Sequence, residues 1–473
     1  MKSRKAIALF LAGAMAAAAL TACGGGSNDG QTTASGGGEE TQAEASGGTL
    51  VVDFWTAPQQ VQYDFWEGKA EAFNATGTQV NGQTVEVHVQ QMPESPSSEA
   101  GIQNAIATGT APAVSENINR GFAATLAASD VVYDLSAEDW FNDVIEARQM
   151  GDTMESWAID GKQYVLPVYV NPMSWQWNMK ALEVFGYDEA PTTIAELQDI
   201  MSQWNDKADE LAAIGVTHSF YRPSLQRPDQ YWDRWYDFMM PYDAISQGKS
   251  IVDGTTLTMD KDAAVKAMEV LGLFGNTIQQ GELSSIWIED QPSVLVTINA
   301  PWEISLYRES NKVYGEDYVY GPALVENEGD TPYCFADSKG LTFYKTDNIS
   351  EDEHQGAVEF VKWVYNAENS AQTDLEWLNA TTMLPVRGDL NENETFASVM
   401  EEYPELSALA QWVPYSMPGL ATDKDADIWT AFTESAMSPY IGTVTGAEPG
   451  NAPEATSFVE AGMEAMKTAG GLS

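Results

Sequence analysis

Four acidic residues near the C-terminus have the spacing of a calcium-binding loop. Asp423, Asp425, Asp427 and Glu434 fall at positions 1, 3, 5 and 12 of such a loop, where calcium takes oxygen ligands. Position 6 of the loop needs a glycine for its sharp turn, but Ile428 stands there. The same acids are typical of a helix start, because carboxylates stabilise the amino-terminal end of a helix. We therefore expect a helix start and no metal site.

Motifs for covalent or metal-assisted catalysis are absent from the sequence. It contains no G-x-S-x-G nucleophile elbow, no H-E-x-x-H zinc helix, no Walker loop and no C-x-x-C pair. The three histidines, His88, His218 and His354, have no ligand partner at metal spacing. We expect no catalytic residue and no cofactor. A pair of carboxyl groups nevertheless stays open as an acid–base centre, because the chain has 70 Asp and Glu residues.

Tryptophans are the other residues with a recognisable chemistry. The chain has 15 of them, and Trp302 stands in the stretch I-N-A-P-W-E, just after the strand-like residues 294–298. An indole ring at a strand end either closes a packed core or offers a flat apolar platform to a ligand. The residue type and position leave both roles open.

The net charge excludes two classes of partner, nucleic acids and anionic membrane surfaces. Lys and Arg number 23 against 70 acids, and the formal charge of −47 repels both polyanions. We interpret the excess as a solvated surface. The length of 473 residues and the hydrophobic content of 44% predict two domains with large cores.

The first residues read as a targeting segment. Residues 1–22 combine a basic start with an apolar run that is too short to span a membrane, and we interpret them as a signal peptide. The ending L-T-A-C resembles the bacterial lipobox, which implies cleavage before Cys23 and lipidation of its thiol. Residues 23–48 then form a lipidated flexible tether without large apolar residues. Cys334 is the only other cysteine, so no internal disulfide is possible.

Hydrophobic periodicity predicts strands that alternate with helices from Thr49 onward. Runs with period two predict strands, and apolar residues at helical spacing predict amphipathic helices. Thr193 and Glu196 form a capping box before one of these helices. The alternation favours α/β domains with mainly parallel strands. The expected strands are residues 50–54, 85–89, 114–118 and 294–298, and the expected helices are 65–73, 121–128, 194–204, 354–368 and one that begins near Asp425.

Four motifs occur in a fixed order between about Thr49 and Ser473. They are I-Q-N-A-I-A-T-G-T-A-P at 102–112, D-G-K-Q-Y-V-L-P at 160–167 with W-N-M-K at 177–180, I-N-A-P-W at 298–302, and M-L-P-V-R at 383–387. Their order and content resemble the extracellular solute-binding proteins of carbohydrate ABC transporters, the group that includes maltose-binding protein. The chain departs from the family pattern at Ala113, where Asp is usual, and at Ala300, where Gly is usual.

The resemblance implies an α/β, two-lobed periplasmic-binding-protein-like fold of type II. Its ligand cleft lies between lobes that are joined by hinge strands and close by hinge motion. Residues 49–166 and about 341–390 are expected to form lobe 1, and about 172–336 and about 411–473 lobe 2. The chain should cross near 166–171, near 337–341 and after Leu390. In open parallel sheets ligands bind at the carboxyl ends of the strands, so these ends should face the cleft.

The resemblance also implies which residues contact the ligand. A sugar needs flat apolar platforms for its ring faces and polar groups for its hydroxyls. Trp302 is the expected main platform, with Glu303 beside it as an acceptor. Further expected platforms are Trp55, Tyr231, Trp232 and Trp429, with Trp235 and Tyr236 as alternatives to the second-lobe pair, and the expected polar contacts are Gln59, Asn119, Arg120, Asn171 and Asp337.

Each of the polar candidates has a purely structural alternative. Asn119 could cap the helix at 121–128, and Arg120 could pair with a carboxylate. Asn171 could shape a turn before Pro172, and Asp337 could be a solvated loop acid. These alternatives stay open at the level of the sequence.

The function implied by the resemblance is that of a non-catalytic, lipid-anchored receptor. It would capture a sugar, expected to be a neutral oligosaccharide, at the extracellular face of a bacterial cell membrane and deliver it to ABC transporter permease subunits. We expect a monomer that contacts the membrane only through its lipid. The alternatives are a secreted glycoside hydrolase, which needs two carboxyl groups roughly 5 to 9.5 Å apart, and a peptide-binding receptor.

Overall fold

Two large β-sheets organise the chain, together with a two-stranded pair, β8 (Val252–Asp253) and β9 (Thr256–Leu257). The computed structural model describes residues 47–93, 97–151, 153–223, 232–281, 294–301 and 304–473. Residues 47–473 form one compact unit. In the described part of the chain, no helix combines the length and the apolar composition that crossing a bilayer requires.

The first sheet has eight strands in the order β14-β5-β13-β4-β1-β3-β2, with β15 paired to β13. Parallel pairs join β1 to β3 and β4, whereas β13 runs antiparallel to both β4 and β5. The strands are β1 (Thr49–Thr56), β2 (Gln79–Val80), β3 (Gln83–Gln91), β4 (Val114–Ile118), β5 (Leu166–Pro172), β13 (Cys334–Phe343), β14 (Leu384–Pro385) and β15 (Ser416–Met417).

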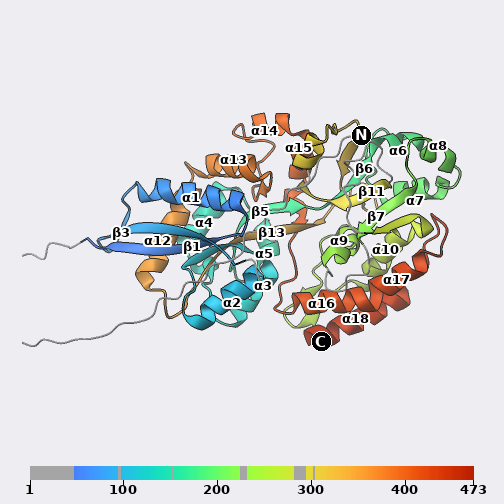
Figure 1. The fold of residues 1–473 in the computed structure, drawn as a ribbon. Coiled ribbons are helices and arrows are strands. Elements are labelled where there is room, and N and C mark those ends of the chain that lie inside the picture. Colours follow the sequence, from blue (N-terminus) through green and yellow to red (C-terminus); the bar gives the residue numbers. More distant parts are fainter. Residues whose placement is uncertain (1–46, 94–96, 152, 224–231, 282–293, 302–303) are drawn as a thin grey trace, which may run out of the picture. The chain divides into compact units, whose positions relative to one another are not determined.

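Helices cover the first sheet because its strands carry apolar residues on the faces that the helices meet. In β1, buried residues alternate with more exposed ones, as expected for a strand with one covered face. Helix α12 packs against β1, and α1 packs against β3. A Cβ at Gly356 of α12 would lie 2.8 Å from a Val52 methyl, so glycine permits this close approach. Figure 1 shows α1 and α13 on one side of β1 and β3, and α2 and α3 on the other.

The second sheet has the order β10-β7-β11-β6-β12. Only Met173 separates β5 of the first sheet from β6 of the second, so one extended stretch runs from sheet to sheet. Every residue of both strands is buried, which fits strands that are covered on both faces. The strands are β6 (Ser174–Asn178), β7 (His218–Pro223), β10 (Ile278–Gly281), β11 (Val294–Asn299) and β12 (Tyr318–Gly321).

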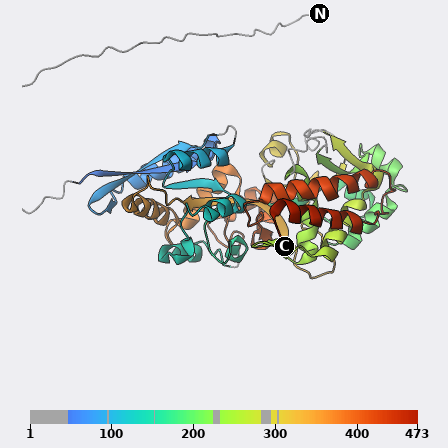
Figure 2. The same ribbon diagram turned by 90° about the horizontal axis from the view of Figure 1, so that it is seen from below.

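Helices from the middle and the end of the chain pack together beside the second sheet. Helix α9 contacts β7 and α10, and α10 contacts α17 and α18. Figure 2 shows the C-terminal helices, coloured red, running together over this part of the unit. The helices are α1 (Gln60–Asn74), α2 (Ser98–Thr108), α3 (Arg120–Ala128), α4 (Asp139–Ala147), α5 (Thr153–Trp157), α6 (Met179–Val184), α7 (Ile194–Gln203), α8 (Ala208–Ala213), α9 (Trp232–Ser246), α10 (Lys261–Gly272), α11 (Ile304–Glu309), α12 (Glu351–Tyr365), α13 (Ser370–Thr381), α14 (Ala397–Glu402), α15 (Pro404–Ala410), α16 (Asp425–Phe432), α17 (Ser438–Val444) and α18 (Thr456–Gly470).

The predicted elements are present, but the expectation of mainly parallel strands was wrong. The capping box of Thr193 and Glu196 starts α7 as expected. Both sheets are mixed, because β5 and β13 pair with each other in opposite directions and β6 lies antiparallel to β11 and β12. Sequence periodicity identifies a strand without giving its direction, so this pairing could not be read from the pattern.

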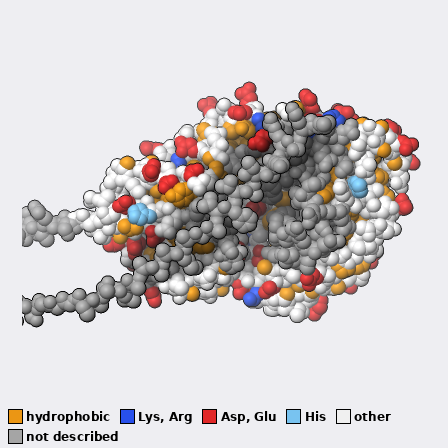
Figure 3. Space-filling model, in the orientation of Figure 1, with side chains coloured by type: hydrophobic (Ala, Val, Ile, Leu, Met, Phe, Trp, Pro, Cys, Tyr) orange, Lys and Arg blue, Asp and Glu red, His pale blue; other side chains and the backbone are white. Residues whose placement is uncertain are grey.

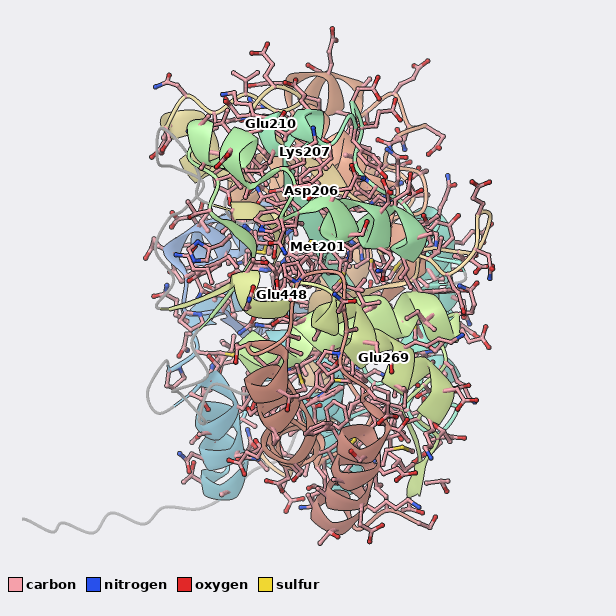
Figure 4. The ribbon with its side chains drawn as sticks, turned by 90° about the vertical axis from the view of Figure 1, so that its right-hand side faces the viewer. Met201, Asp206, Lys207, Glu210, Glu269 and Glu448 are labelled. Atoms are coloured by element: carbon pink, nitrogen blue, oxygen red, sulfur yellow. The ribbon has the colours of Figure 1, made fainter. Side chains whose placement is uncertain are left out.

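The acidic excess lies on the surface. Figure 3 shows Asp and Glu side chains scattered over the visible face with few Lys or Arg between them. In Figure 4, Asp206, Glu210 and Glu448 project outward from the face that α7, α8 and α10 build, and Lys207 pairs with Glu210 at 3.0 Å. Met201 behind them is fully buried. This arrangement agrees with a solvated acidic surface.

Candidate ligand-binding site

Four of the predicted contact residues lie at or just beyond the carboxyl ends of two neighbouring parallel strands. Trp55 is the penultimate residue of β1 and lies opposite Ser115 of β4. The indole is half-buried against the core, and Gln59 is exposed where α1 begins. Asn119 and Arg120 directly follow β4. The sheet therefore brings an aromatic ring and three polar side chains to one edge.

Asn119 caps a helix, as its structural alternative proposed. Its Oδ1 accepts a hydrogen bond of 2.7 Å from the backbone N–H of Phe122, which satisfies one of the free donors at the start of α3. Its Nδ2 donates to Glu99 Oε1 at 3.1 Å. Both polar ends of this side chain are thus engaged within the protein, and a ligand would have to share them.

Arg120 reaches from α3 to two backbone carbonyls. Its guanidinium donates to the carbonyl oxygens of Ala158 and Gly419, the latter at 3.4 Å, and its buried Nε has no protein partner. Burial lowers the pKa of Arg120 to about 10, and the nearby Asp425 carboxyl opposes that shift. An N–H group without a partner in a buried place is a ready donor for a ligand acceptor.

A cavity of about 310 Å³ adjoins Arg120. Residues of the first-sheet region and of the β8–β9 pair line it together, and they supply both donors and acceptors. Its size lies at the lower end of the range for small-molecule sites. The lining is Arg120, Ala158, Asp160, Lys249, Ser250, Val252, Asp253, Gly254, Thr258 and Ala421.

Asn171 and Asp337 lie opposite each other on β5 and β13. Asn171 belongs to the strand and does not shape a turn, so that alternative was wrong. It is buried, and its Oδ1 has no hydrogen-bond partner in the protein. Asp337 is half-buried in the neighbouring strand and is not a loop acid. The pair therefore lies in the strands that lead toward the second sheet.

Trp429 is buried, with 1% of its surface exposed, so its ring is not an open platform for a ligand in this structure. Its ring stacks on Trp235 of α9 with centroids 4.7 Å apart and planes 8° from parallel. Trp235 is also buried and meets Phe335 edge-on. Trp235 is thus an inward-facing residue of the PDQYWDRWYDF segment. The helical spacing of the aromatic residues in the sequence could not show which of them face inward.

Several predicted contacts lie outside the described residues. These are Tyr231, Trp302 and Glu303, together with the lipidation candidate Cys23. Trp232 begins α9, but its side chain is not among those described. Their roles stay predictions.

Sequence reasoning missed Glu116 at this edge of the sheet. Its carboxylate is buried and accepts hydrogen bonds from Thr56 Oγ1 at the end of β1, from Ala57 N in the turn and from Gln62 Nε2 in the first turn of α1. The only sequence signal was an acid in the middle of the expected strand 114–118. A buried acid must have partners, but the sequence does not say which.

The acidic residues with calcium-loop spacing lie largely on a helix. Asp425 is the first residue of α16, so Asp425, Asp427 and Ile428 take helical positions there. Burial raises the pKa of Asp425 to about 7, and Glu99 adds to the shift. Among the residues that the structure describes, no three His, Cys, Asp or Glu side chains are grouped to hold a metal ion.

Known proteins resemble the chain in sequence and in fold. The family model described as bacterial extracellular solute-binding protein matches residues 68–408. An uncharacterized protein from Listeria monocytogenes is 33% identical with a TM-score of 0.75, over 88% of this chain and 98% of that one. No curated protein sequence matches the chain.

Two further solved structures share the fold at low identity. The cyclic alpha-maltosyl-1,6-maltose binding protein from Arthrobacter globiformis is 15% identical with a TM-score of 0.65, over 89% of this chain and 99% of that one. An ABC substrate-binding protein from Listeria monocytogenes in complex with cycloalternan is 14% identical with a TM-score of 0.59, over 90% of this chain and 100% of that one.

Proposed function

The chain belongs to the family of bacterial extracellular solute-binding proteins, and we propose that it captures an oligosaccharide outside the cytoplasm for delivery to an ABC transporter permease. The family gives the class of protein, and the oligosaccharide is our assignment. A neutral sugar is favoured because the described edge combines one aromatic platform with side chains that donate and accept hydrogen bonds.

The observation that carries this assignment is the group of Trp55, Gln59, Asn119 and Arg120 beyond β1 and β4. A half-buried indole can cover the C–H face of a pyranose, and one covered ring face of roughly 80 Å² contributes about 2 kcal/mol. Amide and guanidinium groups at the same edge supply partners for hydroxyls. Trp302 would add a second platform from the other sheet.

Ligand capture would proceed by hinge closure. The extended stretch through Met173 and the long strand β13 are the proposed hinges, since they lead from one sheet region to the other. The lobe boundaries near residues 166, 336, 390 and 411 belong to this proposal. A ligand that contacts both lobes shifts the equilibrium toward the closed state by the contacts it makes only there.

Anchoring through Cys23 is a further part of the proposal. The basic and apolar run before it and the polar residues 24–48 after it support lipidation. Such an anchor would keep a monomeric receptor close to its permease. The strongly acidic surface makes direct adhesion to anionic lipids unfavourable.

Binding to a saccharide panel would test the proposal against both alternatives. The panel contains maltotetraose, cyclic alpha-maltosyl-1,6-maltose, cycloalternan and an oligogalacturonate, and an oligopeptide mixture is added separately. Tryptophan fluorescence reports binding, and chromatography of each mixture afterwards reports cleavage. We expect saturable micromolar binding of at least one neutral saccharide, which remains intact. Cleavage products would identify a hydrolase, and binding of peptides alone would identify a peptide receptor.

A further inference from the structure

One buried carboxylate holds the turn that presents two of the proposed sugar contacts. Glu116 Oε2 accepts from Thr56 Oγ1 at 3.0 Å and from the backbone N–H of Ala57 at 2.8 Å, and Oε1 accepts from Gln62 Nε2 at 2.7 Å. All four residues are at most 2% exposed. Thr56 and Ala57 directly follow Trp55, and Gln62 lies beyond Gln59 in α1, so the carboxylate holds the turn at both ends.

A β-bulge in β4 explains why this side chain points into the turn. Ile118 pairs with Gly340 and Ser115 with Thr342, so Glu116 and Asn117 lie opposite the single residue Leu341. Asn117 has a φ of +69°, a left-handed conformation that Asn tolerates better than most residues. Bulges next to binding sites re-aim a side chain.

The bulge is tied to a proposed hinge strand. Tyr169 of β5 donates from its hydroxyl to Asn117 Oδ1 at 3.1 Å. Tyr169 pairs in register with Lys339 of β13, and its ring stacks on Trp377 with centroids 5.3 Å apart. One chain of contacts thus runs from the hinge strands through the bulge to the turn after β1.

We propose that Glu116 is a positioning residue of the sugar site, which sets the β1–α1 turn and thereby the placement of Trp55 and Gln59. The claim that Trp55 and Gln59 contact sugar rests on the proposed function. The claim that Glu116 places the turn rests only on its hydrogen bonds. Glu116 itself is buried, so it acts through the turn and does not touch the sugar.

The arrangement also predicts a pH dependence of binding. Burial raises the pKa of Glu116 to about 6, although the three donors and Lys339 of β13 oppose that shift. The other titratable groups near it are Tyr169 of β5 and Tyr365 of α12, and burial raises the pKa of both hydroxyls above its ordinary value, well away from the pH range of interest. Protonation removes one acceptor site from a carboxyl group that meets donors on both oxygens. Sugar affinity should therefore fall as the pH is lowered through about 6.

Hydrogen exchange and binding of Glu116→Gln test the proposal separately. In the ligand-free full-length protein at pH 7, we expect amides of residues 54–62 to exchange at least tenfold faster than in the wild type. Glu405→Gln is the matched control, because Glu405 is also a buried carboxylate with a protein partner, Arg308 at 2.6 Å, but lies in α15. It should leave exchange in 54–62 unchanged. If Glu116→Gln does not fold, Thr56→Val removes one donor with little change in shape, and a smaller acceleration in the same segment is expected.

The binding arm uses cyclic alpha-maltosyl-1,6-maltose, or the panel saccharide with the lowest Kd if that probe does not bind. We expect Glu116→Gln to raise Kd at least fivefold at pH 7 and to reduce the pH dependence between 7 and 5 that the wild type shows; the remainder would come from Asp425 beside Arg120. Unchanged exchange in 54–62, or faster exchange with an unchanged Kd and pH profile, would overturn the positioning role. Faster exchange in a protein that binds no saccharide would instead refute the proposed function and leave the control of the turn by Glu116 standing.

Discussion

Replacing Asp374 by asparagine should destabilise the protein by about 4 kcal/mol, within the range of 3 to 5 for breaking a buried ion pair. Asp374 joins two buried arginines. Its Oδ1 accepts from Arg148 Nη2 at 3.0 Å, and its Oδ2 accepts from Arg148 Nε at 3.0 Å and Arg387 Nη1 at 3.1 Å. None of the three side chains is more than 2% exposed. An amide would remove the charge and turn an N–H₂ group toward these donors.

The magnitude follows from what each arginine would keep. Arg387 would retain its pair with Asp389, in which Nε lies 2.8 Å from Oδ1. Arg148 would retain the backbone carbonyls of Pro167 and Val168 at the start of β5, but no carboxylate among the described residues. One buried guanidinium would thus be left uncompensated, which costs several kcal/mol.

Urea unfolding at pH 7 followed by circular dichroism measures this effect. The matched control is Glu460→Gln, which breaks the exposed pair of Lys261 and Glu460, and it should leave the free energy of unfolding nearly unchanged. A loss for Asp374→Asn as small as that of the control, with unchanged m-values, would refute the claim that Asp374 compensates the buried charge of Arg148.

Four further expectations can be checked with simple variants or conditions. Burial between Tyr133 and Phe343 lowers the pKa of His354 to about 4, so below about pH 6.5 the unfolded chain binds a proton at this residue and the folded chain does not. The Tm of the wild type should therefore fall more between pH 7 and 5 than the Tm of His354→Phe. His88→Gln, which changes an exposed histidine, should behave like the wild type. Equal Tm losses in all three would contradict this. Cys23→Ser should release the protein from membranes, and its full recovery with membranes would count against a lipid anchor. Trp302→Ala should weaken sugar binding at least tenfold, or about 1.4 kcal/mol, with a nearly unchanged Tm, whereas a large Tm loss with preserved affinity would make it a core residue. EDTA should leave sugar binding unchanged, and a loss of binding would support a calcium site around Asp425.

Local patterns predicted the secondary structure well because their causes are local. The period-two run at 85–89 lies within β3, and the helix predicted at 194–204 is α7, whose capping box is present and whose C-cap is Trp204. The helix expected at 354–368 begins earlier, at Glu351, because Ser350 and Glu353 form a second capping box there. Strand direction needs partners distant in sequence, so the mixed pairing of β5, β13 and β6 was not predictable.

The candidate site was predictable in part. Trp55, Gln59, Asn119 and Arg120 follow strand ends, and strand ends can be read from the sequence. Trp429 shows the limit, because its burial against Trp235 depends on how α16 packs on α9. Glu116 shows a second limit of sequence-based prediction, because the bulge that turns its side chain inward arises from the pairing register of β4 with β13.

Closure of the protein on a saccharide is the most direct measurement. Glu71 of α1 and Glu464 of α18 are exposed and lie beside the first and second sheet regions, and Cys334 is buried, so introduced cysteines at the two glutamates can be labelled selectively in full-length Cys23→Ser protein. Energy transfer between the labels is followed while the tightest-binding panel saccharide is added. We predict that the distance shortens, with the same saturation midpoint as the tryptophan fluorescence. Saturable binding without any change in the distance would contradict capture by hinge closure.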